Sequence, residues 1–324
     1  MKKILIIFGG NSYEYLISCK SAKTILENID RKKYDITTVG ITTDNHWYIF
    51  NDDPNMLTND TWLNGNISHI DTLIPFLKSF DKVFPIMHGN PLENGNLQGM
   101  FNLFNIPYVG SGLLPSIISY DKDITKIICT HNNIPMIPSI TILKNQDIKN
   151  IPFEYPVIIK PAKCGSSIGI NIAKNNKELK EYLKEAFLYD DKILIEKYIK
   201  SRELECAILD GKKRKVSPIG EIKSSNIIYD YEAKYNKEST LTIPANIPKN
   251  LSEQIQELSL KIFDILSLKD LARIDFLYDY NHQKLYFNEV NTMPGFTSSS
   301  MYPKLLKELK IPLKELITKL IELN

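Results

Sequence analysis

The first third of the chain alternates between short apolar runs and helical patterns. Lys3 to Phe8 is a continuous apolar run, which is typical of a strand buried on both faces. A Gly-Gly-Asn turn follows, and Ser12 is placed to cap a helix with apolar positions at Leu16, Ala22, Ile25 and Leu26. Because β and α elements alternate, we expect a parallel sheet in an N-terminal α/β domain, residues 1–118. Its further elements are expected at 34–41, 82–87 and 106–110 as strands and at 97–105 as a helix.

The middle of the chain predicts a smaller α+β unit, residues 119–205. Its strands are expected in hairpin order, and Asn175 is placed to cap a helix that ends near residue 187. A Gly/Ser loop, residues 164–169, runs from one strand directly into the next. The other expected elements are a helix at 121–130 and strands at 139–143, 157–161, 170–173 and 193–197.

The last third, residues 206–324, predicts a second α+β unit. A polar, aromatic loop at 224–239 precedes an amphipathic helix at 251–266. Asn250 and Glu253 have the spacing of a capping box at the start of that helix. A hairpin follows at 272–291. The sequence therefore predicts one parallel-sheet α/β domain followed by two α+β domains.

Composition narrows the class of protein. The 324 residues are too many for one compact core, so two or three domains are expected. The formal charge is only +2, from 40 basic and 38 acidic side chains, so neither nucleic acid nor a membrane surface is an expected partner. Four scattered cysteines form no C-x-x-C pair, which predicts free thiols and a cytoplasmic location.

The last predicted hairpin carries the strongest chemical signal. Strand side chains alternate between faces, so Arg273 and Asp275 share one face of the first strand. A turn at 281–283 sets Asp275 opposite Glu289 and Arg273 opposite Asn291. Facing carboxylates repel each other unless a proton or cation lies between them, and carboxylate and amide oxygens suit Mg²⁺. A solvated hairpin face whose charges align by chance is the alternative.

Residues 160–169 combine two lysines with a loop of small residues. Such a loop exposes backbone N–H groups to an anion, and Lys160 and Lys163 add positive charge, so a phosphate cradle is predicted beside the alternative of an ordinary hairpin loop. The loop also matches the G-x-S-x-G elbow of serine hydrolases, which needs a helix straight after it. A β-like run follows instead, and His282, the one histidine after the serine, is placed in a turn. A hydrolase is therefore disfavoured, and neither a P-loop nor a G-x-G-x-x-G fingerprint is present.

Two further segments have both a functional and a structural interpretation. Residues 193–199, followed by Glu203, fit an adenine slot or simply a buried strand and its exit. Residues 229–235 are too polar for a core strand and fit a lid or a surface loop with aromatic anchors.

Together these features resemble the ATP-grasp enzymes, and specifically the D-alanine–D-alanine ligase family. The resemblance runs over nearly the whole chain, and the joint order of its motifs is specific although each motif alone is weak. It implies the three-domain ATP-grasp architecture, with an N-terminal parallel-sheet domain and two α+β domains that clamp ATP. The motifs are Gly9 to Glu14, His88-Gly89 through Gln98-Gly99, Ile106 to Gly110, Asp121-Lys122, Lys160-Pro161, Gly165 to Ser167, Tyr229 to Tyr235, Arg273 to Asp275 and Asn288 to Gly295.

The resemblance implies an ATP-dependent, ADP-forming ligase that makes D-alanyl-D-alanine for peptidoglycan. ATP would phosphorylate the first D-alanine, and the amine of the second would attack the acyl phosphate. Glu14 would hold the ammonium group of the first substrate, and Ser166 and Tyr235 would link with Glu14 to fasten a lid. Arg273 and the Gly295 N–H would stabilise the tetrahedral oxyanion.

The resemblance also implies the cofactor and substrate sets. ATP would bind with two Mg²⁺ ions, or Mn²⁺, held by Asp275, Glu289 and Asn291. His88 would belong to the first-substrate site, and Ser300 and Met301 would form the second-substrate pocket. Lys122, Lys160 and Lys234 would contact the phosphates, and the other residues implied to hold ATP are Ser167, Glu196, Lys197, Tyr198, Ile199 and Glu203.

Departures from the family pattern bear on the substrates. The usual H-G-x-x-G-E-D-G carries Leu92 and Asn94 in place of a glycine and an aspartate, so its turn must be built differently. The N-terminal stretch also resembles glycopeptide-resistance ligases, which make D-alanyl-D-serine or D-alanyl-D-lactate. Tyr235 fits an amine as second substrate, and the apolar Met301 fits D-alanine better than D-serine. D-serine stays open, as does a non-catalytic ATP-grasp-like binding protein, and a homodimer is the family's usual assembly.

Overall fold

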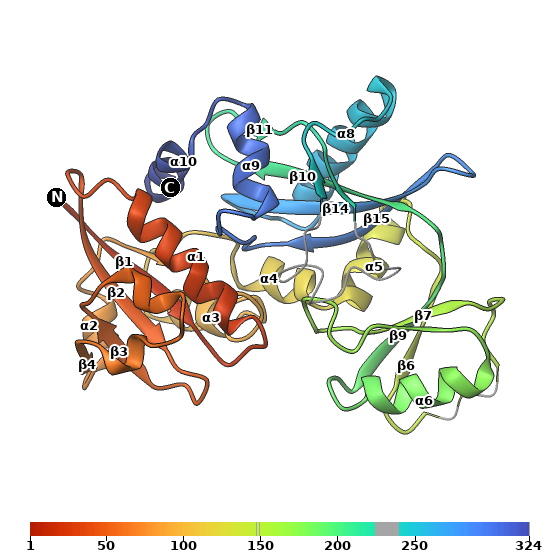
Figure 1. The fold of residues 1–324 in the computed structure, drawn as a ribbon, viewed down its shortest axis with the longest axis horizontal. Coiled ribbons are helices and arrows are strands. Elements are labelled where there is room, and N and C mark those ends of the chain that lie inside the picture. The colour runs from red at the N-terminus through yellow and green to blue at the C-terminus, as the bar shows by residue number, and fades with distance from the viewer. Residues whose placement is uncertain (147, 149, 224–239, 324) are drawn as a thin grey trace.

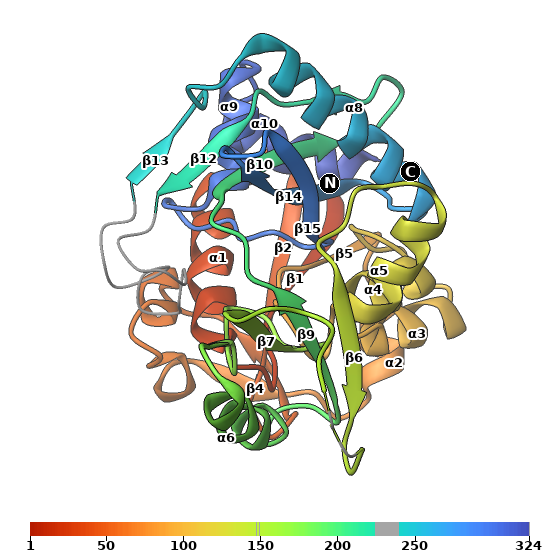
Figure 2. The same cartoon turned by 90° about the vertical axis from the view of Figure 1, so that its right-hand side faces the viewer.

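Three separate β-sheets divide the chain, and each carries its own helices (Figure 1). The structure is a computed structural model that describes residues 1–146, 148, 150–223 and 240–323. Figure 2 shows the central sheet below the C-terminal sheet, with helix α6 (Asn176–Ala186) on the side away from it. No helix within these described ranges is long and apolar enough to cross a membrane.

The N-terminal sheet is mixed, in the order β4-β3-β2-β1-β5. Strand β1 (Lys2–Gly9) runs parallel to β2 (Tyr34–Ile41) and β5 (Lys82–Pro85), which confirms the predicted parallel core. The β/α alternation did not reveal two further strands, β3 (Trp47–Phe50), which is antiparallel to β2, and β4 (Ile67–His69), which is antiparallel to β3. The remaining elements are η1 (Pro54–Leu57), η2 (Trp62–Asn64), α2 (Leu73–Leu77) and α3 (Asn96–Leu103).

Two local predictions for this domain are wrong. The segment 106–110 is not a strand, because only one bridge, from Val83 to Tyr108, joins it to the sheet. Ser12 does not cap α1 (Tyr15–Asn28), whose first turn begins after Glu14. Instead the Ser12 hydroxyl donates to the His88 carbonyl at 2.6 Å and accepts from the Glu14 N–H at 3.2 Å. This bridge fixes the turn that presents Glu14.

The central sheet has the order β6-β9-β7-β8, so it is not a simple run of hairpins. Only β7 and β8 are adjacent in both sequence and space, and β9 lies between β6 and β7. The predicted cap is confirmed, since the Asn175 side chain accepts from two N–H groups of α6 at 3.0 Å. The strands are β6 (Ser139–Leu143), β7 (Val157–Pro161), β8 (Asn171–Ala173) and β9 (Lys192–Lys197), preceded by α4 (Leu113–Tyr120) and α5 (Lys122–His131).

The C-terminal sheet has the order β13-β12-β10-β14-β15, with β11 beside β10. Helix α8 begins at Lys249 after Pro248 without a side-chain cap, so the predicted capping box is wrong. The predicted register of the hairpin is confirmed, because Asp275 pairs with Glu289 and Arg273 with Asn291. The elements are β10 (Arg202–Leu209), β11 (Lys215–Val216), β12 (Gly220–Lys223), β13 (Thr240–Thr242), α8 (Lys249–Ile265), β14 (Leu271–Asp279), β15 (Lys284–Asn291), α9 (Met301–Glu308) and α10 (Leu313–Glu322).

The first and last parts of the chain share one hydrophobic core. Buried residues of α9 and α10, such as Tyr302 and Leu316, belong to the same cluster as the strands of the N-terminal sheet. The Tyr34 hydroxyl donates to Glu322 at 2.8 Å, and α10 lies beside the N-terminal domain in Figure 1. The three-domain division stays a proposal, since β10 contains residues on both sides of the expected boundary at 205/206.

Candidate active site

A cleft of about 820 Å³ opens where the three sheets meet. The N-terminal domain contributes Glu14 and His88, the central domain Lys160, and the C-terminal domain Arg273. Most of the predicted site residues that the structure describes line this cleft. Lys197 and Lys163 do not, and the side chains of both are exposed outside it, so the prediction of Lys163 as part of the phosphate cradle is wrong. Tyr235 and Lys234 lie outside the described residues. The fold thus gathers residues that are up to 287 positions apart, from Glu14 to Met301.

The acidic hairpin already has positive charge from the protein itself. Arg273 donates two hydrogen bonds to Asp275, at 2.8 and 2.7 Å, and its Nε lies 3.0 Å from the Glu205 carboxylate. Lys122 Nζ lies 3.6 Å from the Glu289 carboxylate. Burial acts to lower the pKa of Arg273, but the neighbouring carboxylates outweigh burial and raise it well above its ordinary value. The facing carboxylates are therefore offset by two cationic side chains.

The donor set of the hairpin still fits a hard cation. Asn291 donates through Nδ2 to Asp275 at 3.0 Å, so its Oδ1 oxygen takes no part in this hydrogen bond. The Glu289 carboxylate and this amide oxygen both line the cleft, and they are ligands that Mg²⁺ prefers. Within the described ranges, no group of three or more His, Cys, Asp or Glu side chains forms a metal site. A cation here would need further oxygens, which substrate phosphates supply in such sites.

The Gly/Ser loop closes the cleft against Glu14. Ser166 Oγ donates to the Glu14 carboxylate, and both Ser166 and Ser167 have positive φ, at 50° and 60°. Non-glycine residues rarely take this conformation. Two successive residues of this kind form the centre of a tight turn, which the Ile168 N–H closes by donating to the Gly165 carbonyl at 3.1 Å. The loop joins two strands, β7 and β8, so the nucleophile elbow and the hydrolase are excluded by its setting.

Substituting Gly165 by alanine is expected to raise the KM for the first substrate. A Cβ at this position would lie 2.5 Å from the Glu14 carboxylate, so the carboxylate must move. Gly99→Ala is the control, because its nearest contact would be an ordinary 3.8 Å. Steady-state kinetics of both variants measure the effect. Equal KM values for the two variants would contradict a substrate-binding role for Glu14.

His88 presents an unused acceptor to the cleft. Its Nδ1 lies 3.0 Å from the Met293 carbonyl, so Nδ1 carries the proton. Nε2 is buried and, among the residues that the structure describes, has no hydrogen-bond partner. Burial lowers the pKa of His88, so the imidazole is neutral at neutral pH. Its Nε2 lone pair is thus free to accept from a substrate ammonium group.

Glu93, beside Glu14 in the same cleft, is protonated near neutral pH. Burial and the Glu14 charge raise the pKa of Glu93 to about 8, although the Gly89 N–H donates to its carboxyl group at 2.7 Å. An unfolded glutamate ionises near pH 4.5. Between these two values the folded protein binds a proton that the unfolded chain has lost, so stability falls as pH rises.

Replacing Glu93 by glutamine should therefore remove a pH dependence of stability. We expect the unfolding free energy of the wild type, minus that of Glu93→Gln, to fall between about pH 5 and about pH 8. Urea unfolding of both proteins across this range measures the difference. A difference that stays constant with pH would show that Glu93 titrates normally.

The residues predicted to hold the nucleotide line the part of the cleft between the central and C-terminal sheets. Apolar residues from both sheets, including Ile158 and Phe276, line it together with Tyr198 and Ile199. Lys160 Nζ lies 2.7 Å from the Glu196 carboxylate and 3.5 Å from Asn288 Oδ1. The wall is therefore apolar where a base would stack, with a lysine at its edge.

Ser300 and Met301, which are predicted to form the second-substrate pocket, line the cleft at the start of α9. A Cβ on Gly295 would lie 2.7 Å from Ser300 Oγ, which accepts from the Thr297 N–H at 3.0 Å. Met301 is buried and lies against Gly220, where a Cβ would lie 2.7 Å from its sulfur. This end of the cleft is consequently tight and partly apolar.

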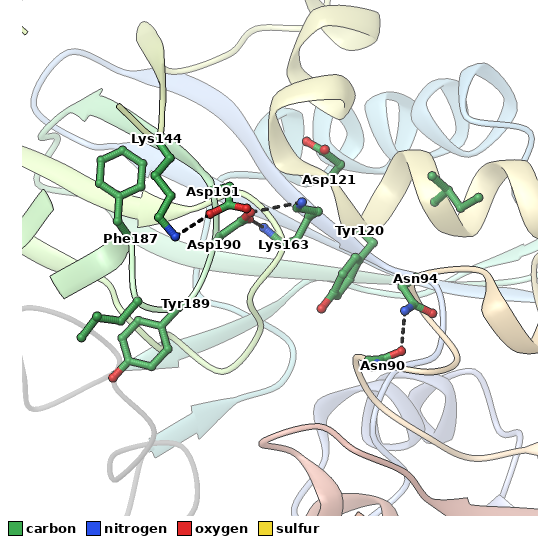
Figure 3. Close-up of a pocket in the computed structure, with 12 residues that line it drawn as sticks. Asn90, Asn94, Tyr120, Asp121, Lys144, Lys163, Phe187, Tyr189, Asp190 and Asp191 are labelled. Atoms are coloured by element: carbon green, nitrogen blue, oxygen red, sulfur yellow. Dashed lines mark hydrogen bonds and ion pairs between the residues drawn. The ribbon is translucent and has the colours of Figure 1, made fainter. Parts of the chain in front are cut away.

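A second hollow, of about 490 Å³, is lined by residues such as Tyr120, Lys163 and Asp190 (Figure 3). Its lysines are paired, Lys163 with Asp190 at 3.1 Å and Lys144 with Asp191 at 2.9 Å. Asp190 also accepts from the Lys163 N–H at 2.7 Å. The bonds of Asp190 to Lys163 hold the residue that directly precedes the Gly/Ser loop, so this hollow supports the cleft without belonging to it.

Sequence reasoning missed three charged residues of this region. Glu205 follows Glu203 by two positions on β10, so the alternation of strand side chains puts both on one face of the sheet. This spacing could have identified Glu205 as a residue of the cleft. Glu93 lies within the motif from His88 to Gly99, but the sequence predicts no chemical role for it. Lys126, which donates to Glu196 from α5, had no sequence signal because the partners are 70 positions apart.

The three sheets around one cleft define the fold of an ATP-grasp ligase. The chain belongs to the D-alanine–D-alanine ligase family. Residues 3–111 match the family model described as D-ala D-ala ligase N-terminus, and residues 130–322 match D-ala D-ala ligase C-terminus. The chain is an ATP-dependent ligase.

Similar proteins of known name span the whole chain. The chain is 41% identical to a D-alanine–D-alanine ligase of Caldicellulosiruptor bescii, over 99% of this chain and 94% of that protein. It is 42% identical to the D-alanine–D-alanine ligase B of Clostridium tetani, over 99% and 93%. Among solved structures, the VanG D-Ala:D-Ser ligase from Enterococcus faecalis has a TM-score of 0.87 at 34% identity, over 99% and 98%. The D-alanine-D-alanine ligase from Coxiella burnetii has a TM-score of 0.88 at 31% identity, over 99% and 93%.

Proposed function

We propose that this ligase joins two molecules of D-alanine, with each predicted residue in the role that its place in the cleft supports. The observation that carries the proposal is the hairpin register, which puts Arg273 opposite Asn291 and Asp275 opposite Glu289 in the cleft that Glu14 also lines. The chemistry has one central difficulty. A carboxylate is a poor electrophile, because its leaving group would be oxide.

ATP solves this difficulty by transferring its γ-phosphoryl group to the first substrate. An oxygen of the D-alanine carboxylate attacks the γ-phosphorus, and ADP leaves. Lys122 and Lys160 contact the phosphates from the cleft wall, beside the N–H groups of the loop that contains Ser167. Lys234 is proposed to join them, although it lies outside the described residues.

The remaining ATP contacts come from the exit of β9 and the start of β10. Tyr198 and Ile199 line the apolar slot for adenine, and Glu203 lies in reach of the ribose. The Glu196 carboxylate is occupied by lysines, so we propose that its backbone, and that of Lys197, meets the base.

Asp275, Glu289 and Asn291 are proposed to hold two Mg²⁺ ions. When bound, these ions offset phosphate charge and align the γ-phosphoryl group for in-line transfer. Lys122 and Arg273 then share the carboxylates with the ions. Mn²⁺ has the same ligand preference and is an alternative ion.

The first D-alanine binds by its ammonium group and the peptide bond forms beside it. Glu14, oriented by Ser166, accepts from the ammonium, and the neutral His88 offers a second acceptor. The neutral amine of the second D-alanine attacks the acyl phosphate, a C–N bond forms, and phosphate leaves with the C–O electron pair and takes up the proton that the amine loses. Arg273 and the Gly295 N–H stabilise the oxyanion in between. Tyr235, outside the described residues, is proposed to fasten the lid over Ser166.

D-alanine is proposed as the second substrate because Met301 is buried and apolar where the second side chain lies. A hydroxymethyl group there would leave its hydroxyl without a partner from Met301, which costs about 1–3 kcal/mol. The likeness to a D-Ala:D-Ser ligase favours D-serine as the one competing function.

The experiment supplies ATP, Mg²⁺ and D-alanine, with equal D-serine or D-lactate added, and identifies each product by mass. We expect D-alanyl-D-alanine as the main product in every mixture. Mainly D-alanyl-D-serine would retain the mechanism and overturn the assignment of Met301. Tight ATP binding without any phosphate release would instead favour a non-catalytic binding protein.

We also propose a homodimer in the cytoplasm, where ATP is available. Consecutive helices α4 and α5 each expose an i, i+3 pair of apolar side chains, Leu114 with Ile117 and Ile124 with Ile127. An exposed apolar face on adjacent helices is suited to a second copy of the chain. Sedimentation equilibrium measures the mass, and a monomer at micromolar concentration would contradict the dimer.

A further inference from the structure

A buried triad of charges lies directly behind the nucleotide side of the cleft. Glu196 accepts from Lys126 through Oε1 and from Lys160, at 2.7 Å, through Oε2. All three side chains are buried, with at most 11% of each exposed. Two lysines share one carboxylate, so the triad carries one net positive charge.

The three residues lie at different distances from the surface of the cleft. Lys160 and Glu196 line the cleft, whereas Lys126 approaches Glu196 from helix α5 and does not line it. Burial acts to raise the pKa of Glu196, but the two lysines outweigh burial and hold it below its usual range, so Glu196 is ionised. The excess charge is therefore presented to the cleft by Lys160.

We propose that Lys126 is a positioning residue for the phosphates of ATP. Lys126 pairs with Glu196 from helix α5, outside the cleft. Glu196 therefore keeps an ionic partner when Lys160 turns toward a phosphate. Without Lys126, Glu196 would retain Lys160 as its only partner and cancel its charge. Lys126 thus acts on ATP through Glu196 and Lys160, without touching the nucleotide.

The energetics favour this arrangement over a simple structural pair. An ionised carboxylate that loses its only buried partner is strongly destabilised, so a lone Lys160–Glu196 pair would resist opening. A second lysine removes that penalty, because Glu196 keeps one partner in either position of Lys160. The inference rests on the proposed function, in which Lys160 contacts ATP phosphates.

Replacing Lys126 by methionine should weaken ADP binding about 10- to 100-fold, the range expected when one charged contact to a ligand is lost. Adenosine, which has no phosphate, should bind the variant as it binds the wild type. Lys126→Arg should retain the affinity for ADP, since arginine keeps the charge. Calorimetric titration of the full chain with ADP and with adenosine measures each dissociation constant.

A double variant separates positioning from structural support. In Lys126→Met combined with Glu196→Gln, the carboxylate that would retain Lys160 is gone, so ADP affinity should recover to near that of the wild type. The double variant leaves no buried carboxylate unpaired, and Lys160 keeps Asn288 Oδ1 as an acceptor at 3.5 Å, so this variant also serves if Lys126→Met alone does not fold. A loss of ADP affinity in the double variant as large as in Lys126→Met overturns the proposal.

A matched control tests whether any ion pair on α5 has the same effect. Lys192 pairs with Asp121 at 2.7 Å and Asp123 at 3.2 Å, at the start of α5 and outside the cleft. Lys192→Met should leave ADP binding unchanged, and a loss as large as that of Lys126→Met overturns the proposal. Equal loss of ADP and adenosine binding in Lys126→Met does so as well. A wild-type protein that binds no ADP would instead overturn the proposed function itself.

Discussion

Replacing Arg273 by methionine is expected to lower kcat by about 10²- to 10³-fold, the loss typical of removing one oxyanion donor. Arg273 is held in place before the reaction, because Asp275 fixes its fork through two hydrogen bonds and Glu205 lies 3.0 Å from its Nε. A donor that is already oriented stabilises developing charge without reorganising. Steady-state kinetics with saturating ATP and D-alanine measure the loss.

The loss of kcat must be separated from a loss of stability. Methionine keeps much of the side-chain volume but leaves two buried carboxylates, Asp275 and Glu205, without their guanidinium, so thermal unfolding is measured alongside. Arg202→Met is the matched control, since Arg202 makes a similar two-pronged pair with Glu221 in the same sheet but outside the cleft. We expect Arg202→Met to retain kcat near the wild-type value. Equal kcat in the two variants would contradict the oxyanion role of Arg273.

Replacing Gly9 by alanine is expected to destabilise the fold by at least about 3 kcal/mol. Gly9 has φ of 92°, and a Cβ there would lie 2.1 Å from the Ile41 carbonyl oxygen. That oxygen belongs to the backbone and already accepts from the Gly10 N–H at 2.8 Å, so it has little freedom to move. The strand end must shift, and the turn that presents Glu14 shifts with it.

Gly112→Ala is the control for the Gly9 substitution. Gly112 has extended backbone before α4, and its new Cβ would meet only ordinary contacts, at 3.9 Å or more. We expect its unfolding free energy to stay within about 0.5 kcal/mol of the wild type. Urea denaturation of both variants measures the difference, and similar values for the two would show that the predicted clash relaxes freely.

The predicted pairing of Asp275 with Glu289 is correct because two departures from the predicted hairpin cancel. The connection between the strands is one residue longer than predicted, since Asp279 pairs with Lys284, and a bulge adds one residue to the second strand. A turn at 281–283 would pair Phe276 with Asn288, whereas the structure pairs Phe276 with Phe287. Asn288 is the extra residue of a β-bulge, and this bulge restores the predicted pairing of Asp275 with Glu289. Alternation therefore predicted the faces correctly, while the bulge had no sequence signal.

Other features could not be predicted because they depend on contacts between distant segments. Long apolar runs revealed the parallel strands of the N-terminal sheet, but the antiparallel strands β3 and β4 are short and partly exposed, so they lack a clear pattern. The facing carboxylates were expected to need a metal, yet Arg273 and Lys122 approach them in the folded chain. The neighbours that raise the pKa of Glu93, Glu14 above all, were equally out of reach.

The central claim is that the first substrate is activated as an acyl phosphate in this cleft. The most direct measurement uses D-alanine with ¹⁸O in both carboxylate oxygens, together with ATP and Mg²⁺, and determines the mass of the released phosphate. Because a carboxylate oxygen attacks the γ-phosphorus and leaves with it, each phosphate is expected to carry one ¹⁸O atom. Released phosphate without ¹⁸O, at a rate matching dipeptide formation, would contradict the account.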